Sequence, residues 1–373
     1  MTDAPPSDLT ASGMRVLVLS AAMGGGHLQI ARELARRLAE RGHDVEVVDL
    51  LDLMPRLFAR FLGWVYPWLV NRAPSVYQMV YDTFFVADQT AGERADVPVR
   101  AALPQLRQWV GRNRPDLTVS TYPLCSLALG ELRVEGTLSC PAVTVVTTFS
   151  VNNLWVHPGI DRELCISEPA AADAARRTGR RADVVGPVVR PGFDAPADPE
   201  LRDRLGVPPD RRLAVVSTGS MGLSGSATHA ASVIATIPGW TPLVLCGRST
   251  RVRREVRRID GAIALDWVSD MQRLLASADA LVDNNCGMTA KESLAAGLPV
   301  VTFRPLPGHG RDDARAMEEL GLTQIVHTDE QLVGALLRLA GSPQTRHDRA
   351  RRGRALFVAD AAAHLEEQLL AVR

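Results

Sequence analysis

A histidine directly after three glycines is the first feature of this sequence that could carry out chemistry. The turn Gly24-Gly25-Gly26-His27 follows a short apolar run, Arg15–Ser20, which we predict to be a buried strand. Glycines let a ligand approach the backbone closely, and a fixed imidazole can accept a hydroxyl proton near neutral pH. We therefore predict that His27 is a catalytic base, although a histidine that only caps the turn fits the same pattern.

The same turn lacks the patterns of two common phosphate sites. A dinucleotide fingerprint ends in a glycine at the position of Gln29, and a Walker loop ends in Gly-Lys-Ser or Gly-Lys-Thr, which is absent. The turn therefore supports neither a P-loop enzyme nor a nicotinamide-dependent enzyme such as a nucleotide-sugar epimerase.

Two segments in the second half of the chain also follow predicted strands. Residues 217–225 are mostly Ser, Thr and Gly, which suits a diphosphate at a helix start or simply a loop. Thr289 and Glu292 have the spacing of a helix capping box, but Glu292 could instead accept the hydroxyls of a ribose. Lys291, the only lysine in the chain, is expected at a solvated helix position rather than beside phosphates.

Aromatic residues are concentrated in one segment. Nine of the 18 Phe, Trp and Tyr residues lie between Phe58 and Phe85, and Arg56, Arg60 and Arg72 lie among or beside them. Aromatic rings with arginines suit the boundary between membrane and water. A well-packed helical hairpin would produce the same clustering, so both interpretations remain open.

Strands and helices alternate along the chain, which predicts an α/β fold with two doubly wound domains. A chain of 373 residues also exceeds what one hydrophobic core usually serves. Further apolar strands are expected at 44–50, 117–120, 142–147, 213–217, 241–246, 262–265, 280–282 and 300–303. A proline-rich linker is expected over 190–212. We predict a disordered N-terminus (1–13), an N-terminal domain (14–190), a C-terminal domain (191–350) and a C-terminal segment (351–373) with a helix over 351–372 that packs on the first domain.

Composition excludes several classes of protein. The formal net charge is zero, so the basic excess of a nucleic-acid-binding protein is missing. Five scattered cysteines without metal-ligand spacing are typical of a reducing cytosol. The N-terminus lacks a secretion signal, and no apolar stretch is long enough to cross a bilayer. We expect a cytoplasmic protein without a bound metal or cofactor.

Together, the motifs resemble the monogalactosyldiacylglycerol synthase family and its bacterial diacylglycerol glucosyltransferase relatives. They are more distantly similar to the N-acetylglucosaminyltransferase that makes lipid II. Besides the glycine-histidine turn, the resemblance depends on Arg114-Pro115-Asp116, Trp155-Val156-His157-Pro158-Gly159, Gly186-Pro187-Val188, Cys246-Gly247-Arg248 and the run 292–299.

The resemblance implies a GT-B fold, with two Rossmann-like domains facing a central cleft, and an inverting, metal-independent glycosyltransferase. Its donor would be a UDP-sugar and its acceptor a lipid such as diacylglycerol, with the Phe58–Phe85 region on the inner face of the cell membrane. The acceptor would contact Gly25, Gly26, Trp155 and His157. The nucleotide sugar would contact Ser220, Met221, Gly222, Gly247, Arg248, Val268, Gly287, Met288, Thr289, Glu292, His309, Arg311, Asp312 and Asp313.

This chain departs from the family where the acid and the sugar-reading residues should stand. No carboxylate occurs in Ser20-Ala21-Ala22-Met23, and the family's Val-Thr-Asp is Val146-Thr147-Thr148 here. The family's Lys-Ala-Gly is Asn284-Asn285-Cys286. The sugar therefore stays open, and Arg311 could pair with the carboxylate of a uronic acid. Alternatives are a UDP-uronic acid or UDP-GlcNAc donor with a prenyl-phosphoglycerate or other aglycone of specialised metabolism, or a relative that binds without turnover.

Overall fold

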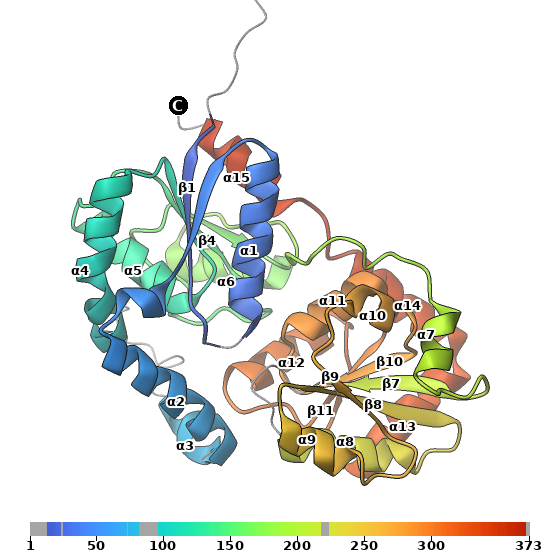
Figure 1. The fold of residues 1–373 in the computed structure, drawn as a ribbon. Coiled ribbons are helices and arrows are strands. Elements are labelled where there is room, and N and C mark those ends of the chain that lie inside the picture. Colours follow the sequence, from blue (N-terminus) through green and yellow to red (C-terminus); the bar gives the residue numbers. More distant parts are fainter. Residues whose placement is uncertain (1–12, 24, 73, 82–95, 218–223, 371–373) are drawn as a thin grey trace, which may run out of the picture.

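The computed structural model describes residues 13–23, 25–72, 74–81, 96–217 and 224–370. Two parallel sheets, each of six strands, form the centres of two domains (Figure 1). The first sheet has the order β2-β1-β3-β4-β5-β6 and the second β12-β11-β10-β7-β8-β9. The predicted disordered segment 1–13 lies outside the described residues except for Gly13, as do Phe84 and Phe85.

The first domain covers both faces of its sheet with helices. Its strands are β1 (Arg15–Ser20), β2 (Asp44–Asp49), β3 (Leu117–Ser120), β4 (Ala142–Val145), β5 (Arg162–Cys165) and β6 (Asp183–Val184). Its helices are α1 (Gly25–Glu40), the short η1 (Leu50–Leu53), α2 (Arg56–Arg72), α3 (Pro74–Tyr81), α4 (Asp96–Asn113), α5 (Pro123–Val134) and α6 (Glu168–Thr178). Leu17 and Leu19 face α4 and α5, whereas Val16 and Val18 face α1, because successive strand side chains alternate between faces.

The second domain repeats this arrangement. Its strands are β7 (Arg212–Val216), β8 (Trp240–Gly247), β9 (Ile263–Asp266), β10 (Ala280–Asp283), β11 (Val300–Phe303) and β12 (Ile325–Val326). Its helices are α7 (Pro199–Arg204), α8 (Ser224–Ala235), α9 (Thr250–Val256), α10 (Met271–Ala276), α11 (Met288–Ala296), α12 (His309–Glu319), α13 (Asp329–Gly341) and α14 (Pro343–Arg354). Helices α8, α9 and α13 cover one face of the sheet, and α10, α11 and α12 cover the other.

The sheet topology predicts where ligands bind. Chain direction across the sheet reverses between β1 and β3 in the first domain and between β7 and β10 in the second. Ligands of doubly wound sheets bind beyond the carboxyl ends of the strands at such reversal points. We therefore expect ligands at the carboxyl ends of the strands in each domain, at its reversal point.

Two predicted segments differ from the structure. The expected linker 190–212 contains α7, which Arg202 ties to the second domain through Asp279 at 3.1 Å. The expected helix 351–372 is wrong: α14 ends at Arg354, and α15 (Ala361–Leu370) begins seven residues later. Between them the chain crosses to the first domain, where Asp360 accepts hydrogen bonds from the first N–H groups of α15, so one continuous helix cannot form.

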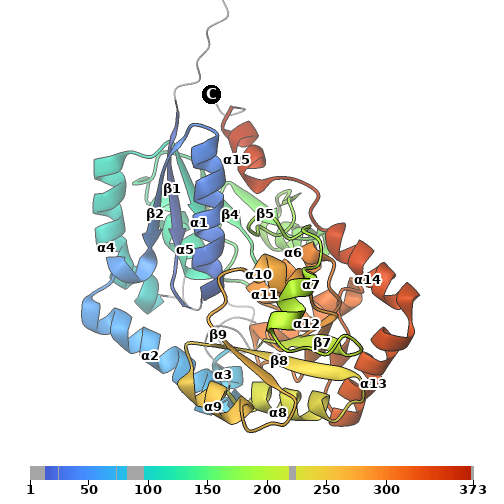
Figure 2. The same cartoon turned by 45° about the vertical axis from the view of Figure 1, so that its right-hand side comes forward.

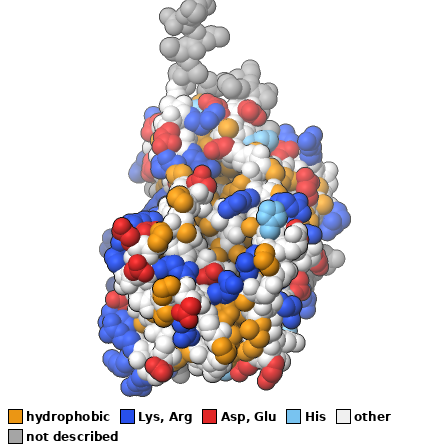
Figure 3. All heavy atoms as spheres, turned by 90° about the vertical axis from the view of Figure 1, so that its right-hand side faces the viewer, with side chains coloured by type: hydrophobic (Ala, Val, Ile, Leu, Met, Phe, Trp, Pro, Cys, Tyr) orange, Lys and Arg blue, Asp and Glu red, His pale blue; other side chains and the backbone are white. Residues whose placement is uncertain are grey.

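Acidic and basic side chains are interspersed on the face that Figure 3 shows. That face carries no extended area of one charge, in keeping with the formal net charge of zero. Among the described residues, no helix is both long enough and apolar enough to cross a membrane.

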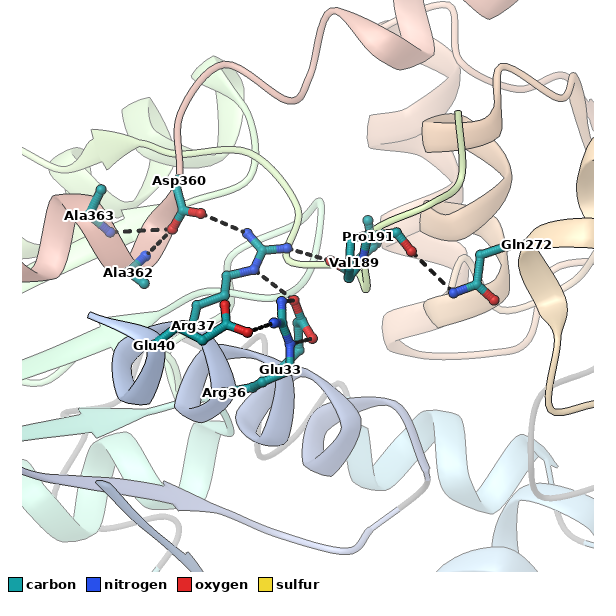
Figure 4. Close-up of polar contacts among 10 residues, drawn as sticks. All are labelled: Glu33, Arg36, Arg37, Glu40, Val189, Pro191, Gln272, Asp360, Ala362 and Ala363. Carbon is teal, nitrogen blue, oxygen red and sulfur yellow. Dashed lines mark hydrogen bonds and ion pairs between the residues drawn. The ribbon is translucent and has the colours of Figure 1, made fainter. Parts of the chain in front are cut away.

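Arg37 joins the two places where the chain crosses between domains (Figure 4). Its guanidinium donates to the carbonyl of Val189 in the first crossing and to Asp360 in the second, at 3.3 Å. Glu33, which is buried, holds the same guanidinium through its Oε1 at 2.8 Å from Nε. One side chain on α1 thus fixes both connections at the same point.

We predict that Arg37→Ala lowers the free energy of unfolding by about 2 kcal/mol, because a buried carboxylate and a crossing carbonyl lose a charged donor. Urea titration of the full chain measures this change. The matched control is Arg251→Ala, which removes only an exposed pair with Glu255 and should change the value by less than about 0.5 kcal/mol. Equal effects of the two substitutions would contradict the assignment.

Candidate active site

The first turns of α1 and α11 meet between the two domains. A side-chain carbon added at Gly26 would lie 3.7 Å from Cβ of Met288, which is ordinary contact distance. One turn further, Gln29 Nε2 donates to Glu292 Oε1 at 3.3 Å. The structure therefore brings the turn with the predicted base and the predicted ribose-binding glutamate together, from opposite domains.

His27 is held in the tautomer that a general base requires. Its Nδ1 lies 3.0 Å from the carbonyl oxygen of Thr121 and 3.0 Å from Oγ1 of Thr147. Because a carbonyl oxygen can only accept, the ring proton resides on Nδ1 and the lone pair on Nε2. Burial lowers the pKa of His27 to about 4, so the imidazole is neutral at physiological pH.

Aromatic side chains fix the ring plane of His27. The edge of Tyr122 contacts the imidazole at a centroid distance of 4.9 Å, and Trp155 lies at 6.1 Å. Trp155 is buried, so it supports the imidazole from within the first domain. The resemblance implies that Trp155 contacts the acceptor; in the structure its buried ring lies beside that of His27.

The prediction that His157 reaches into the cleft is wrong. Its Nε2 lies 3.3 Å from Oε1 of Glu131, and its Nδ1 accepts from the N–H of Gly159 at 3.0 Å. The ring packs directly on Gly130, where an added side-chain carbon would come within 2.1 Å of it. Both ring nitrogens are thus engaged in holding the loop against α5, and His157 has no contact left for an acceptor.

Glu292 is a buried carboxylate without a capping role. The N-cap of α11 is Gly287, so Thr289 lies inside the first turn and the capping-box interpretation is wrong. Burial raises the pKa of Glu292 to about 7, while Arg190 at 3.8 Å and Gln29 oppose the rise. A buried acceptor at the mouth of a helix start is suited to the hydroxyls of a ribose.

Lys291 is buried, which corrects the prediction of a solvated position. Its Nζ donates to the carbonyl of Cys286 at 3.0 Å and lies 5.5 Å from the ring centre of Phe149, in the first domain. Burial lowers its pKa, and the charges of Asp313 and Asp283 act in the opposite direction. The lysine therefore places positive charge between the two lobes of the site.

The predicted sugar-binding helix also contacts the first domain. Asp313 Oδ1 accepts from both the N–H of Ser150, at 2.9 Å, and its hydroxyl, at 2.6 Å. Burial lowers the pKa of His309 to about 4 and raises that of Asp313 to about 6. Arg311 Nε donates to Asp312 at 3.2 Å, so a uronic acid carboxylate would have to compete with that contact.

An exposed tryptophan stands beside Arg248 and Val268, which were predicted to contact the nucleotide sugar, and sequence reasoning missed it. Trp267 follows β9 directly, is 64% exposed and lies 5.6 Å below the guanidinium of Arg248. The sequence analysis predicted nucleotide-sugar contacts for its neighbour Val268 and for Gly247, but not for Trp267. An aromatic residue at the carboxyl end of a predicted strand could have indicated this position. Ser220, Met221 and Gly222 lie outside the described residues. Across the described ranges, no cluster of three potential metal-ligating His, Cys, Asp or Glu side chains occurs.

Comparisons with known proteins agree with this geometry. Residues 27–189 match the family model of monogalactosyldiacylglycerol (MGDG) synthase. The processive diacylglycerol beta-glucosyltransferase of Bacillus subtilis (strain 168) is 21% identical over 367 residues, which cover 95% of this chain and 94% of that protein. The chain is thus similar to diacylglycerol glucosyltransferases over nearly its whole length. The predicted resemblance, and with it the prediction of a glycosyltransferase, is confirmed.

Solved structures share the fold of this glycosyltransferase. The calicheamicin glycosyltransferase is 21% identical, has a TM-score of 0.63, and the match covers 96% of this chain and 99% of that one. The spinosyn rhamnosyltransferase complexed with thymidine diphosphate is 14% identical, has a TM-score of 0.64, and the match covers 95% of this chain and 100% of that one. The predicted GT-B fold is therefore confirmed.

We predict that the affinity of the enzyme for UDP rises as pH increases from 6 to 8. Glu292 has a raised pKa of about 7, so its ionised form, the stronger hydroxyl acceptor, becomes dominant above that pH. Calorimetry should give a dissociation constant about threefold to tenfold lower at pH 8 than at pH 6.

The variant Glu292→Gln should bind UDP with no such pH dependence. The control Glu200→Gln, on the exposed face of α7, should keep it. A wild-type affinity that is constant from pH 6 to pH 8 would count against Glu292 as the ribose acceptor.

Proposed function

We propose that this glycosyltransferase moves a hexose from a UDP-sugar to a hydroxyl of a membrane lipid such as diacylglycerol, with inversion at the anomeric carbon and without a metal ion. The proposal depends on one observation: the helix turn that carries His27, whose proton is fixed on Nδ1, contacts the first turn of the helix that carries Glu292. The acceptor class follows the diacylglycerol glycosyltransferases to which the chain is related.

The reaction is a single displacement. The acceptor oxygen attacks the anomeric carbon while Nε2 of His27 takes its proton, and the bond to the diphosphate breaks with both electrons leaving on UDP. Attack opposite to the leaving group inverts the configuration. The open N–H groups at the start of α11 and the ammonium of Lys291 favour the negative charge that develops on the diphosphate.

The carbonyl of Thr121 takes over part of the role of the missing family acid. It orients the ring as a carboxylate would, and its partial negative charge stabilises the imidazolium that forms during transfer. Burial lowers the pKa of His27 to about 4, and the carbonyl, which carries less charge than a carboxylate, opposes that shift only in part. The imidazole is therefore a weak base, but it is unprotonated on Nε2 at neutral pH.

We further propose that α2 lies on the inner face of the cell membrane. Leu57, Phe61, Trp64 and Trp68 are spaced along one side of this helix and are each at least 47% exposed. The opposite side of the helix packs on the first-domain core through Phe58, Ala59 and Leu62. We call the four exposed residues the α2 stripe.

Charge supports a lipid surface as the partner of the α2 stripe. Arg56 and Arg60 are exposed on the same helix, and guanidinium groups are attracted to anionic lipid headgroups. Trp64 and Trp68 stack at 6.2 Å, and indole rings prefer the headgroup region of a bilayer. One side of α2 thus packs on the first domain, as the well-packed interpretation expects, and the other side is the one that we propose meets the membrane.

The activity test follows labelled sugar from a set of UDP-sugars, including UDP-GlcNAc and a UDP-uronic acid, into diacylglycerol and into a prenyl-phosphoglycerate. We expect His27→Ala to lower kcat about 10²- to 10⁴-fold while UDP affinity stays within about twofold. Thr147→Val should lower kcat about tenfold because the ring loses one of its two partners.

The matched control for these variants is His347→Ala, an exposed histidine of α14, which should retain full activity. Transfer of sugar only to the prenyl-phosphoglycerate would show that the acceptor is not diacylglycerol. Undiminished turnover by His27→Ala would rule out His27 as the base.

For membrane docking, the triple change Phe61→Ser, Trp64→Ser and Trp68→Ser should lower partitioning onto vesicles of phosphatidylglycerol and phosphatidylcholine at least about 100-fold, because three large apolar side chains are lost. Transfer to a short-chain, water-dispersed acceptor should stay within about twofold. The control changes Val134, Leu337 and Val358, exposed apolar residues on other elements, to Ser. Equal loss of vesicle binding in both triple variants would refute the α2 stripe as the docking surface.

A further inference from the structure

Helix α3 belongs to the first domain but contacts the donor helix of the second. Gln78 Oε1 accepts a hydrogen bond from the N–H of Gly308 at 2.7 Å, across 230 positions of the sequence. Figure 2 shows α3 lying beside the second domain. The hydrogen bond connects the consecutive, contacting helices α2 and α3, which we call the hairpin, to the start of α12.

The start of α12 has no acceptor of its own for this N–H group. Gly308 is the N-cap residue and has no side chain, and it adopts φ 71° and ψ −132°, a conformation that favours glycine. In a capping box, the third residue of the helix accepts from the N-cap N–H, but here that residue is Arg311, which can only donate. Gln78 supplies the missing acceptor from the other domain.

Helix α12 carries the residues predicted to read the donor sugar. His309 directly follows Gly308, and Asp313 lies one turn further on, where it accepts from Ser150 of the first domain. The orientation of the first turn therefore decides where these side chains point. Gln78 and Ser150 hold that turn from two separate elements of the first domain.

The hairpin that carries Gln78 also carries the apolar surface proposed to meet lipid. On α3, Val76 is 44% exposed and Met79 is 62% exposed, and they follow the α2 stripe along the chain. Gln78 itself is half-buried, on the side toward Gly308. One short helix thus has exposed apolar side chains and a polar side chain bound to the donor domain.

We propose that Gln78 is a positioning residue that couples the seating of the hairpin on a membrane to donor binding at α12. A hairpin fixed by lipid keeps the carboxamide on Gly308 and the first turn of α12 in place, so the enzyme binds its UDP-sugar more tightly on a membrane than in solution. This inference rests on the proposed function and adds a link between its acceptor and donor sites.

The test compares donor KM with one acceptor lipid presented either in vesicles or in detergent micelles. Wild type should show a donor KM about threefold to tenfold lower on vesicles, the range that one ordinary hydrogen bond gives. Gln78→Leu should lose this difference, with its KM on vesicles rising to the micelle value and kcat staying within about twofold. Gln78→Glu keeps an acceptor oxygen and should retain the difference.

The matched control is Ser75→Ala, an exposed residue of the same helix, which should behave as wild type. A Gln78→Leu variant with an unchanged vesicle KM, or with KM raised equally on both surfaces, would overturn the coupling. A Gln78→Leu variant that is less stable to heat but keeps the lower KM on vesicles would likewise contradict the coupling. Gln78 would then only cap α12. Failure of the proposed function is separate, because wild type would then transfer no sugar even in micelles.

Discussion

The rest of the site depends on the contact between the first turns of α1 and α11. Each turn starts at the reversal point of its own sheet, so the two sheets direct two helix N-termini toward one place. Helix N-termini attract negative charge through their unpaired N–H groups. In the function we propose, backbone dipoles from both domains hold the diphosphate, while His27 acts on the acceptor and Glu292 binds the ribose.

The chemistry at His27 shows how a site can change its acid and keep its geometry. Neither Ser20–Met23 nor Val146–Thr148, where the resemblance implies carboxylates, contains one. The imidazole still keeps a defined tautomer because Thr121, directly after β3, offers a carbonyl. A backbone acceptor cannot be lost by substitution and cannot be protonated at neutral pH. Because a carbonyl lacks the full negative charge of a carboxylate, the imidazole is less basic than it would be beside an acid.

The sequence predicted the features that arise from local patterns, and it failed where distant elements meet. The strand and glycine turn before His27 were predictable because the apolar run and its break are adjacent in the chain. The burial of Lys291 was not, because Asp283, Asp313 and Phe149 come from three other elements. His157 was misplaced since nothing in its own loop reveals that Gly130 makes room for the ring. Gln29 and Gln78 each form a hydrogen bond across the domain boundary, which no local pattern records.

The single anchoring of both chain crossings by Arg37 has a mechanical consequence. If the domains rotate about that point, atoms beside it barely move, while displacement grows with the distance from the pivot. The crossings lie at one end of the boundary between the two domains and α3 lies at the other end (Figure 1), so α3 is far from the pivot. A small rotation of one domain relative to the other would leave α1 undisturbed. The same rotation would break or form the contact between α3 and α12.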